Sequence, residues 1–244
     1  MISRRSTLGL IASAPLLPVT SLSYAQGDDI GTIGEQIRLW RDDPANSSFF
    51  EVPAPGEAKG TLILAPEDPR VIEAARLLAG LPRNRPPIEI ARSMLKALPE
   101  NSRMEWPRDT PGAKRPANPI IVAFFAATQT IPFSGDQTAW CSAFACWTMQ
   151  RAGLDHPRSA GSRSFRSWGQ KTNDPQVGDI VVYQNKSDPV FGHVAFFDGF
   201  ADANKTKVWL IGGNQSDQLN RDDWAIETNS LKLHSFRTGP GLRT

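Results

Sequence analysis

The chain has 244 residues, of which 40% are hydrophobic and 21% charged, so it can bury the core of one large domain or of a main domain with a smaller addition. Its formal net charge is +2, and this excess comes from the first 25 residues, which contain two arginines and no acidic residue. We therefore expect no basic surface of the kind that binds nucleic acid.

Residues 1–25 have the pattern of a secretory signal peptide. Paired arginines precede an apolar run over residues 8–19, and a small-x-small end at residues 23–25 predicts cleavage after Ala25. The apolar run is too short to span a membrane, and no cysteine for a lipid anchor follows it. The paired arginines resemble a twin-arginine export signal. We expect a bacterial protein exported by that route to the periplasm or the medium, with no membrane anchor after cleavage.

Residues 26–117 predict a helical and loop extension whose role the sequence does not reveal. Apolar periodicity indicates helices at 33–40, 69–79 and 88–98, and a short strand is expected at 61–65. Proline-rich, charged stretches connect these elements.

From residue 118 onward, helices are followed by strands. Asn118 and a following proline predict a helix start, and a second helix is expected over 139–151, stopped by a glycine. Apolar runs bounded by glycines then predict three strands, at 179–183, 193–200 and 207–211, and a last strand is expected at 231–237. Helices first and an antiparallel meander afterwards indicate an α+β fold, with residues 118–244 as one domain.

The chain has two cysteines, Cys141 and Cys146, on the same predicted helix. Five helical residues separate Cα atoms by roughly 8 Å and rotate the side chain by about 140°, so a disulfide is not expected. Cys141 lies in the first turn, where unpaired N–H groups and the helix dipole favour a nucleophilic thiolate. The alternative is that Cys141 is only a small buried hydrophobic residue. For Cys146, which lies deeper in the helix, this is the interpretation that we prefer.

A cysteine nucleophile needs a base and a group that orients it. Of the three histidines, His193 directly follows a glycine and opens an apolar strand, which favours it as the base over a purely structural histidine. Asn214 ends the following strand and is the candidate orienting residue, with an ordinary turn former as its alternative. Gln215, Asp217 and Glu227 are weaker candidates for this role, and Asp198 is expected on the opposite face of the strand.

Other catalytic motifs are not found. The sequence has no G-x-S-x-G, H-E-x-x-H, paired C-x-x-C or Walker motif. With three histidines and one eligible cysteine, neither a zinc site nor any other metal or cofactor is expected.

The motifs AWCSAFACWTMQRAGL, SRSFRSWGQ, VGDIVVY, FGHVAFFDGF and LIGGNQSDQLN resemble, in this order, the CHAP family (cysteine, histidine-dependent amidohydrolases/peptidases) and NlpC-like cell-wall hydrolases. The resemblance implies a papain-like fold in which the nucleophile helix packs on an antiparallel sheet. It implies Cys141 as nucleophile, His193 as base and Asn214 as the third residue. Its substrate would be peptidoglycan, cut at N-acetylmuramoyl-L-alanine linkages or within stem and cross-bridge peptides.

Three further residues are candidates for contacting substrate or the oxyanion. Gln137 is expected to assist the Cys141 backbone N–H in binding the oxyanion. Trp140 is expected to form a wall of the site, and Ser142 follows the nucleophile.

Two alternatives remain open at this point. One is a catalytically inactive CHAP-like protein that binds the cell wall or acts as an adaptor. The other is a secreted eukaryotic chain, because four N-x-[ST] sequons begin at Asn46, Asn185, Asn204 and Asn214. The last sequon would place a glycan on a candidate catalytic residue, which favours a bacterial origin.

Overall fold

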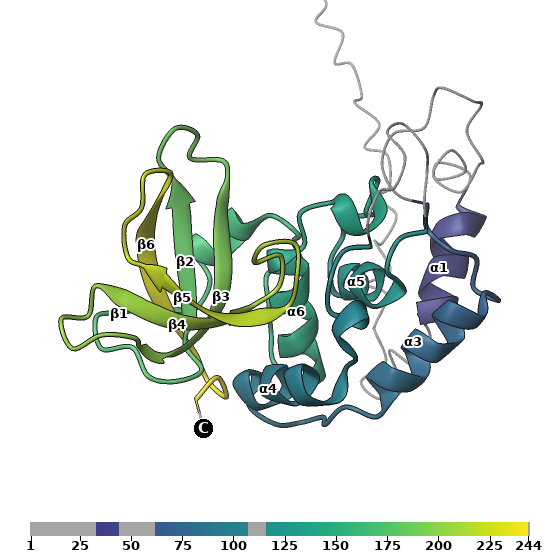
Figure 1. Cartoon of the computed structure of the whole chain (residues 1–244), viewed down its shortest axis with the longest axis horizontal. Coiled ribbons are helices and arrows are strands. Elements are labelled where there is room, and N and C mark those ends of the chain that lie inside the picture. Colours follow the sequence, from purple (N-terminus) through teal and green to yellow (C-terminus); the bar gives the residue numbers. More distant parts are fainter. Residues whose placement is uncertain (1–32, 44–61, 107–115, 244) are drawn as a thin grey trace, which may run out of the picture.

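The computed structural model describes residues 33–43, 62–106 and 116–243, so the predicted signal peptide lies outside the described residues. Within these ranges the protein has the predicted α+β architecture. The helices of the N-terminal half gather on one side and an antiparallel sheet forms the other, with helix α6 between them (Figure 1).

Each helix of the described ranges is short, and three of them begin with proline. A proline at the first position lacks only an N–H that has no partner there anyway, and its fixed φ suits a helix. The side chains of Asp68 and Asn118 cap two of these helices by accepting the N–H groups of Arg70 and Ile120, and the helix start at Asn118 is the one that the sequence predicted. The α-helices are α1 (Ile33–Asp42), α3 (Pro69–Ala79), α4 (Pro87–Ala97), α5 (Pro119–Phe124) and α6 (Cys141–Arg151). The 3-10 helices are η3 (Glu100–Ser102), η4 (Phe125–Ala127), η5 (Gly135–Gln137) and η6 (Ser162–Arg166).

The sheet has six strands in the order β1-β6-β2-β3-β4-β5, and every pairing is antiparallel. The strands are β1 (Gln170–Thr172), β2 (Ile180–Asn185), β3 (Gly192–Phe200), β4 (Lys207–Gly212), β5 (Asn220–Ala225) and β6 (Leu231–Thr238). The four predicted strands correspond to β2, β3, β4 and β6. Instead of the strand predicted at 61–65, the described residues there form a single bridge between Leu62 and Pro116.

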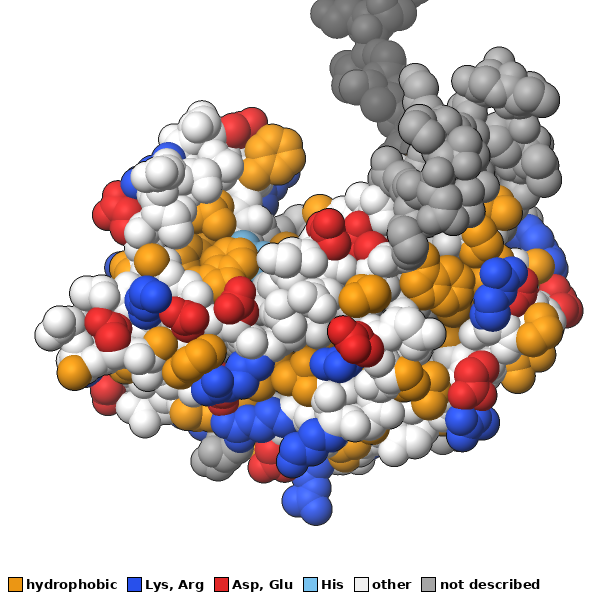
Figure 2. Space-filling model, viewed as in Figure 1, with side chains coloured by type: hydrophobic (Ala, Val, Ile, Leu, Met, Phe, Trp, Pro, Cys, Tyr) orange, Lys and Arg blue, Asp and Glu red, His pale blue; other side chains and the backbone are white. Residues whose placement is uncertain are grey.

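A hollow separates the sheet from the helical half on the face shown in Figure 2, and part of a histidine side chain is visible at its floor. Hydrophobic side chains border the floor on the side of the sheet (Figure 2). No helix in the described ranges is long and apolar enough to cross a membrane.

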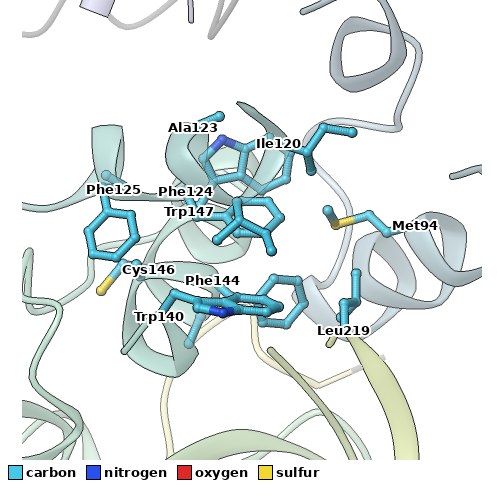
Figure 3. Close-up of a cluster of buried hydrophobic side chains, with 14 of the residues drawn as sticks. Met94, Ile120, Ala123, Phe124, Phe125, Trp140, Phe144, Cys146, Trp147 and Leu219 are labelled. Atoms are coloured by element: carbon cyan, nitrogen blue, oxygen red, sulfur yellow. The ribbon is translucent and has the colours of Figure 1, made fainter. Parts of the chain in front are cut away.

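The main hydrophobic core is continuous across residue 118. Met94 of α4 and Ile120 of α5 pack in one buried cluster with Trp147 of α6 (Figure 3). Arg151, at the end of α6, also donates hydrogen bonds to the carbonyl oxygens of Pro82, Leu81 and Ala79. The described part of the N-terminal extension is therefore packed against the helix that carries Cys141.

Strand β3 is buried on both faces. Val194 and Phe196 belong to the main core, whereas Ala195 and Phe197 belong to a second cluster on the other face of the sheet. This alternation follows from the two-residue period of a strand. The strand that begins with Gly192 and His193 is thus held from both sides.

Candidate active site

Cys141 is the first residue of α6, in agreement with its predicted place in the first helical turn. Trp140 is the N-cap residue, and its side chain makes no capping hydrogen bond. The first backbone N–H groups of a helix have no partner within the helix, so this end of α6 offers hydrogen-bond donors beside the sulfur. Cys141 and Cys146 are both free, as their spacing predicted.

Burial raises the pKa of the Cys141 thiol, and the backbone N–H groups of Val194, Ser142 and Cys141 act in the opposite direction. The neutral thiol is therefore the resting form, whereas the helix start alone had favoured a thiolate. The difference arises because only 6% of the residue is exposed and a charged sulfur would lose its hydration. Since Val194 follows His193 in β3, this interaction also brings the sulfur next to the start of that strand.

His193 enters the site from the second position of β3. The preceding Gly192 is required by the strand pairing, because a Cβ there would lie 2.1 Å from the carbonyl oxygen of Tyr183. The imidazole stacks on the indole of Trp224, with ring centroids 4.6 Å apart. Burial lowers the pKa of His193 to about 4, and its contact with Gln215 opposes this shift. The ring is therefore neutral at pH 7 and able to accept a proton.

The orienting group at His193 is Gln215, whereas the sequence had favoured Asn214. Nε2 of His193 lies 3.3 Å from Oε1 of Gln215, a fully buried residue. Asn214 has a left-handed backbone with φ of 58°, as befits the turn-forming alternative. Both belong to the segment 213–219 after β4, which we call the Gln215 loop.

A chain of hydrogen bonds fixes which imidazole nitrogen carries the proton. Nδ2 of Asn220 donates to the backbone carbonyl of Gln215 at 3.2 Å, so Oδ1 of Asn220 is left to accept from Nε2 of Gln215 at 2.5 Å. Oε1 of Gln215 therefore faces His193 and can only accept. The proton of the neutral imidazole is placed on Nε2, and Nδ1 keeps its lone pair.

The remaining candidate residues take other places. The Gln137 amide donates to Oδ1 of Asp136 at 3.1 Å, and the Ser142 hydroxyl donates to the carbonyl of Ser159 at 2.6 Å. Trp140 is fully buried in the main core, so it forms no exposed wall of the site.

The other two histidines and Asp198 also have their own partners. Asp198 forms ion pairs with Arg92 and Arg221, away from the imidazole. His156 accepts a hydrogen bond from the N–H of Arg158, and His234 contacts the hydroxyl of Ser235. Among the described residues, no three His, Cys, Asp or Glu side chains gather where they could hold a metal ion.

Comparison with known families identifies the class. Residues 133–214 match the family model of the CHAP domain, and this part of the chain is a CHAP domain, as its motifs had indicated. The match includes Cys141, His193 and Asn214 but ends one residue before Gln215. No curated protein and no solved structure matches the chain. A CHAP domain implies a cysteine- and histidine-dependent amidohydrolase or peptidase, generally one that acts on the cell wall.

Proposed function

We propose that this protein hydrolyses amide bonds in peptidoglycan, with Cys141 as nucleophile, His193 as base and Gln215 as the residue that orients the base. The observation that carries the proposal is the bond between Nε2 of His193 and Oε1 of Gln215. This bond leaves Nδ1 of His193 able to accept a proton. The next residue of the same strand, Val194, interacts through its backbone N–H with the Cys141 sulfur. The CHAP match supports the reaction class.

The proposed reaction has two halves. Nδ1 of His193 takes the thiol proton while the sulfur attacks the amide carbonyl, because a thiol becomes an effective nucleophile as it loses its proton. The backbone N–H groups at the start of α6 bind the resulting oxyanion. The imidazolium then protonates the leaving amine, and a thioester forms on Cys141. Water, deprotonated by the same imidazole, hydrolyses the thioester and restores the thiol.

Alkylation of Cys141 tests this function. In a Cys146→Ala background, iodoacetamide reports on one thiol, and digestion of purified sacculi is measured as the thiol is consumed. We expect digestion to fall in proportion to the alkylated fraction of Cys141. Full digestion by protein alkylated at Cys141 would refute the proposal.

A second candidate function, a wall-binding protein without catalysis, is favoured by the burial that raises the pKa of the Cys141 thiol. Such a protein would sediment with sacculi but release no soluble fragments. It would also bind equally well after the Cys141→Ala substitution. Release of fragments that depends on Cys141 decides against it.

Export is part of the proposal, because peptidoglycan lies outside the cytoplasmic membrane. The support is the pattern of residues 1–25, which lie outside the described residues. If the route is the twin-arginine one, replacing Arg4 and Arg5 together by lysine retains the full-length protein in the cytoplasmic fraction. Undiminished export of the double variant would rule out that route.

A further inference from the structure

A short segment of the N-terminal extension is joined to the Gln215 loop. Residues 103–106, which we call the strap, lie outside the CHAP match. The N–H of Leu219 donates to the carbonyl of Arg103 at 2.7 Å, and the N–H of Glu105 donates to a carbonyl of the loop, that of Asp217, at 2.9 Å. An antiparallel bridge lies between these two bonds. The strap thus fixes the backbone of the loop that carries the orienting glutamine.

The side chain of Glu105 reaches the other half of the site. Its Oε1 accepts a hydrogen bond from Nε1 of Trp140 at 3.0 Å. Trp140 is fully buried and directly precedes Cys141. A hydrogen bond from a buried N–H to a carboxylate is stronger than one between neutral groups. One residue therefore holds the Gln215 loop by its backbone and the start of α6 by its side chain.

Trp140 also touches the loop directly. A Cβ on Gly213 would lie 2.3 Å from the Trp140 ring and 2.8 Å from Cβ of Phe144, so the indole lies against the loop backbone. Leu219, at the end of the loop, belongs to the same buried cluster as Trp140 (Figure 3). The orientation of the indole therefore sets how far the start of α6 stands from the loop.

We propose that Glu105 is a positioning residue: it holds the Trp140 indole against Gly213 and so fixes the distance between Cys141 and the His193–Gln215 pair. This inference rests on the proposed function. It gives the extension a catalytic purpose, since a misplacement of about 1 Å far from the reacting atoms can cost on the order of 100-fold in rate.

The test is a set of variants of the full chain, assayed by the initial rate of sacculus digestion and by thermal melting. Glu105→Ala is expected to lower the rate about 10- to 100-fold. Glu105→Gln keeps an oxygen acceptor for the Trp140 N–H, and we expect its rate to remain within about threefold of the parent. Trp140→Phe removes the donor and leaves Glu105 intact. If both residues act through the hydrogen bond between them, the double variant Glu105→Ala/Trp140→Phe digests sacculi no more slowly than the slower of the two single variants.

Arg92→Ala is the matched control. It removes the ion pair with Asp198, a different link between the extension and the sheet, and should lower the melting temperature without changing the rate more than about twofold. Additive losses in the double variant, or a loss in Arg92→Ala as large as in Glu105→Ala, would overturn the positioning role. If the parent digests sacculi and Glu105→Ala digests them equally fast, only this inference fails. A parent that digests nothing overturns the proposed function and this inference with it.

Discussion

The indole of Trp140 lies against the backbone of Gly213, so the residue before the candidate nucleophile touches the loop that orients the candidate base. The contact is possible because Gly213 has no side chain, and the adjacent Gly212 leaves room for the Gln215 amide in the same way. A Cβ on Gly212 would lie 2.5 Å from Oε1 of Gln215. The paired glycines allow two elements far apart in the sequence to meet closely.

The substitution Gly213→Ala tests this contact. The added methyl group cannot fit without moving the buried indole, so we expect a loss of roughly 1–3 kcal/mol in the free energy of unfolding and a slower digestion of sacculi. Denaturant unfolding measures the first and fragment release the second. Gly161→Ala is the control, because its Cβ would meet the nearest atom at an ordinary 3.6 Å. Equal stability of the two variants would show that the indole does not lie where the structure places it.

Substitutions at Gln215 and Asn214 show which of the two residues orients His193. Gln215→Ala removes the acceptor at Nε2 of His193 and lets the imidazole change its orientation and tautomer, so we expect kcat to fall on the order of 100-fold. Asn214→Gly preserves the left-handed backbone and should leave kcat within about threefold. The reverse ranking would restore Asn214 as the third residue.

The pH dependence of Cys141 alkylation follows from the shifted pKa values of Cys141 and His193. Because burial raises the pKa of the thiol, and His193 with a pKa of about 4 is already neutral near pH 7, no thiolate–imidazolium pair exists in the resting site. The rate of reaction with iodoacetamide in the Cys146→Ala background should therefore rise continuously from about pH 6 to 10. A plateau that extends from acidic pH through neutrality would indicate a preformed ion pair and contradict this charge state.

Acid should destabilise the fold through two histidines. Burial lowers the pKa of both His193 and His156 to about 4, from an ordinary value of 6.5. Between these values the unfolded chain binds protons that the folded chain does not. The free energy of unfolding therefore falls as the pH drops from about 6.5 toward 4, and the contribution of the two neutral histidines is fully present above pH 6.5. Each histidine contributes up to about 3 kcal/mol. The measurement is urea unfolding at pH 7 and pH 4.5.

The variant His156→Asn isolates the contribution of His156 to this pH dependence. Asparagine cannot gain a proton in this range, and its side-chain oxygen can replace the imidazole as acceptor for the Arg158 N–H. We expect the difference in unfolding free energy between pH 7 and pH 4.5 to shrink by about half relative to the parent. An unchanged difference would mean that His156 is protonated in the folded state.

The sequence was sufficient for elements with strong local signals. Helix α6 and strand β3 were predicted because apolar residues and glycines mark their ends, and this located Cys141 and His193. Strand β5 was not predicted, since its sequence NRDDWA is polar and it lies at the edge of the sheet. Its ladder with β4 is a long-range pairing that no local pattern reveals.

The lack of a local signal also explains why the sequence did not identify Gln215 as the third residue or predict the role of the strap. Asn214 and Gln215 are neighbours, and the choice between them depends on backbone angles within a turn, among them the φ of 58° at Asn214. Glu105 lies 35 residues before Trp140, in a stretch that has no motif. Only the folded chain shows that they meet.

The most direct test of the central claim is mass spectrometry of the fragments released from purified sacculi by the parent, Cys141→Ala and Cys146→Ala. We expect the parent and Cys146→Ala to release the same peptides, each with a new amine and a new carboxylate at the cut amide bond, and Cys141→Ala to release none. Release of those peptides by Cys141→Ala at the parent rate would contradict the assignment of Cys141 as the nucleophile.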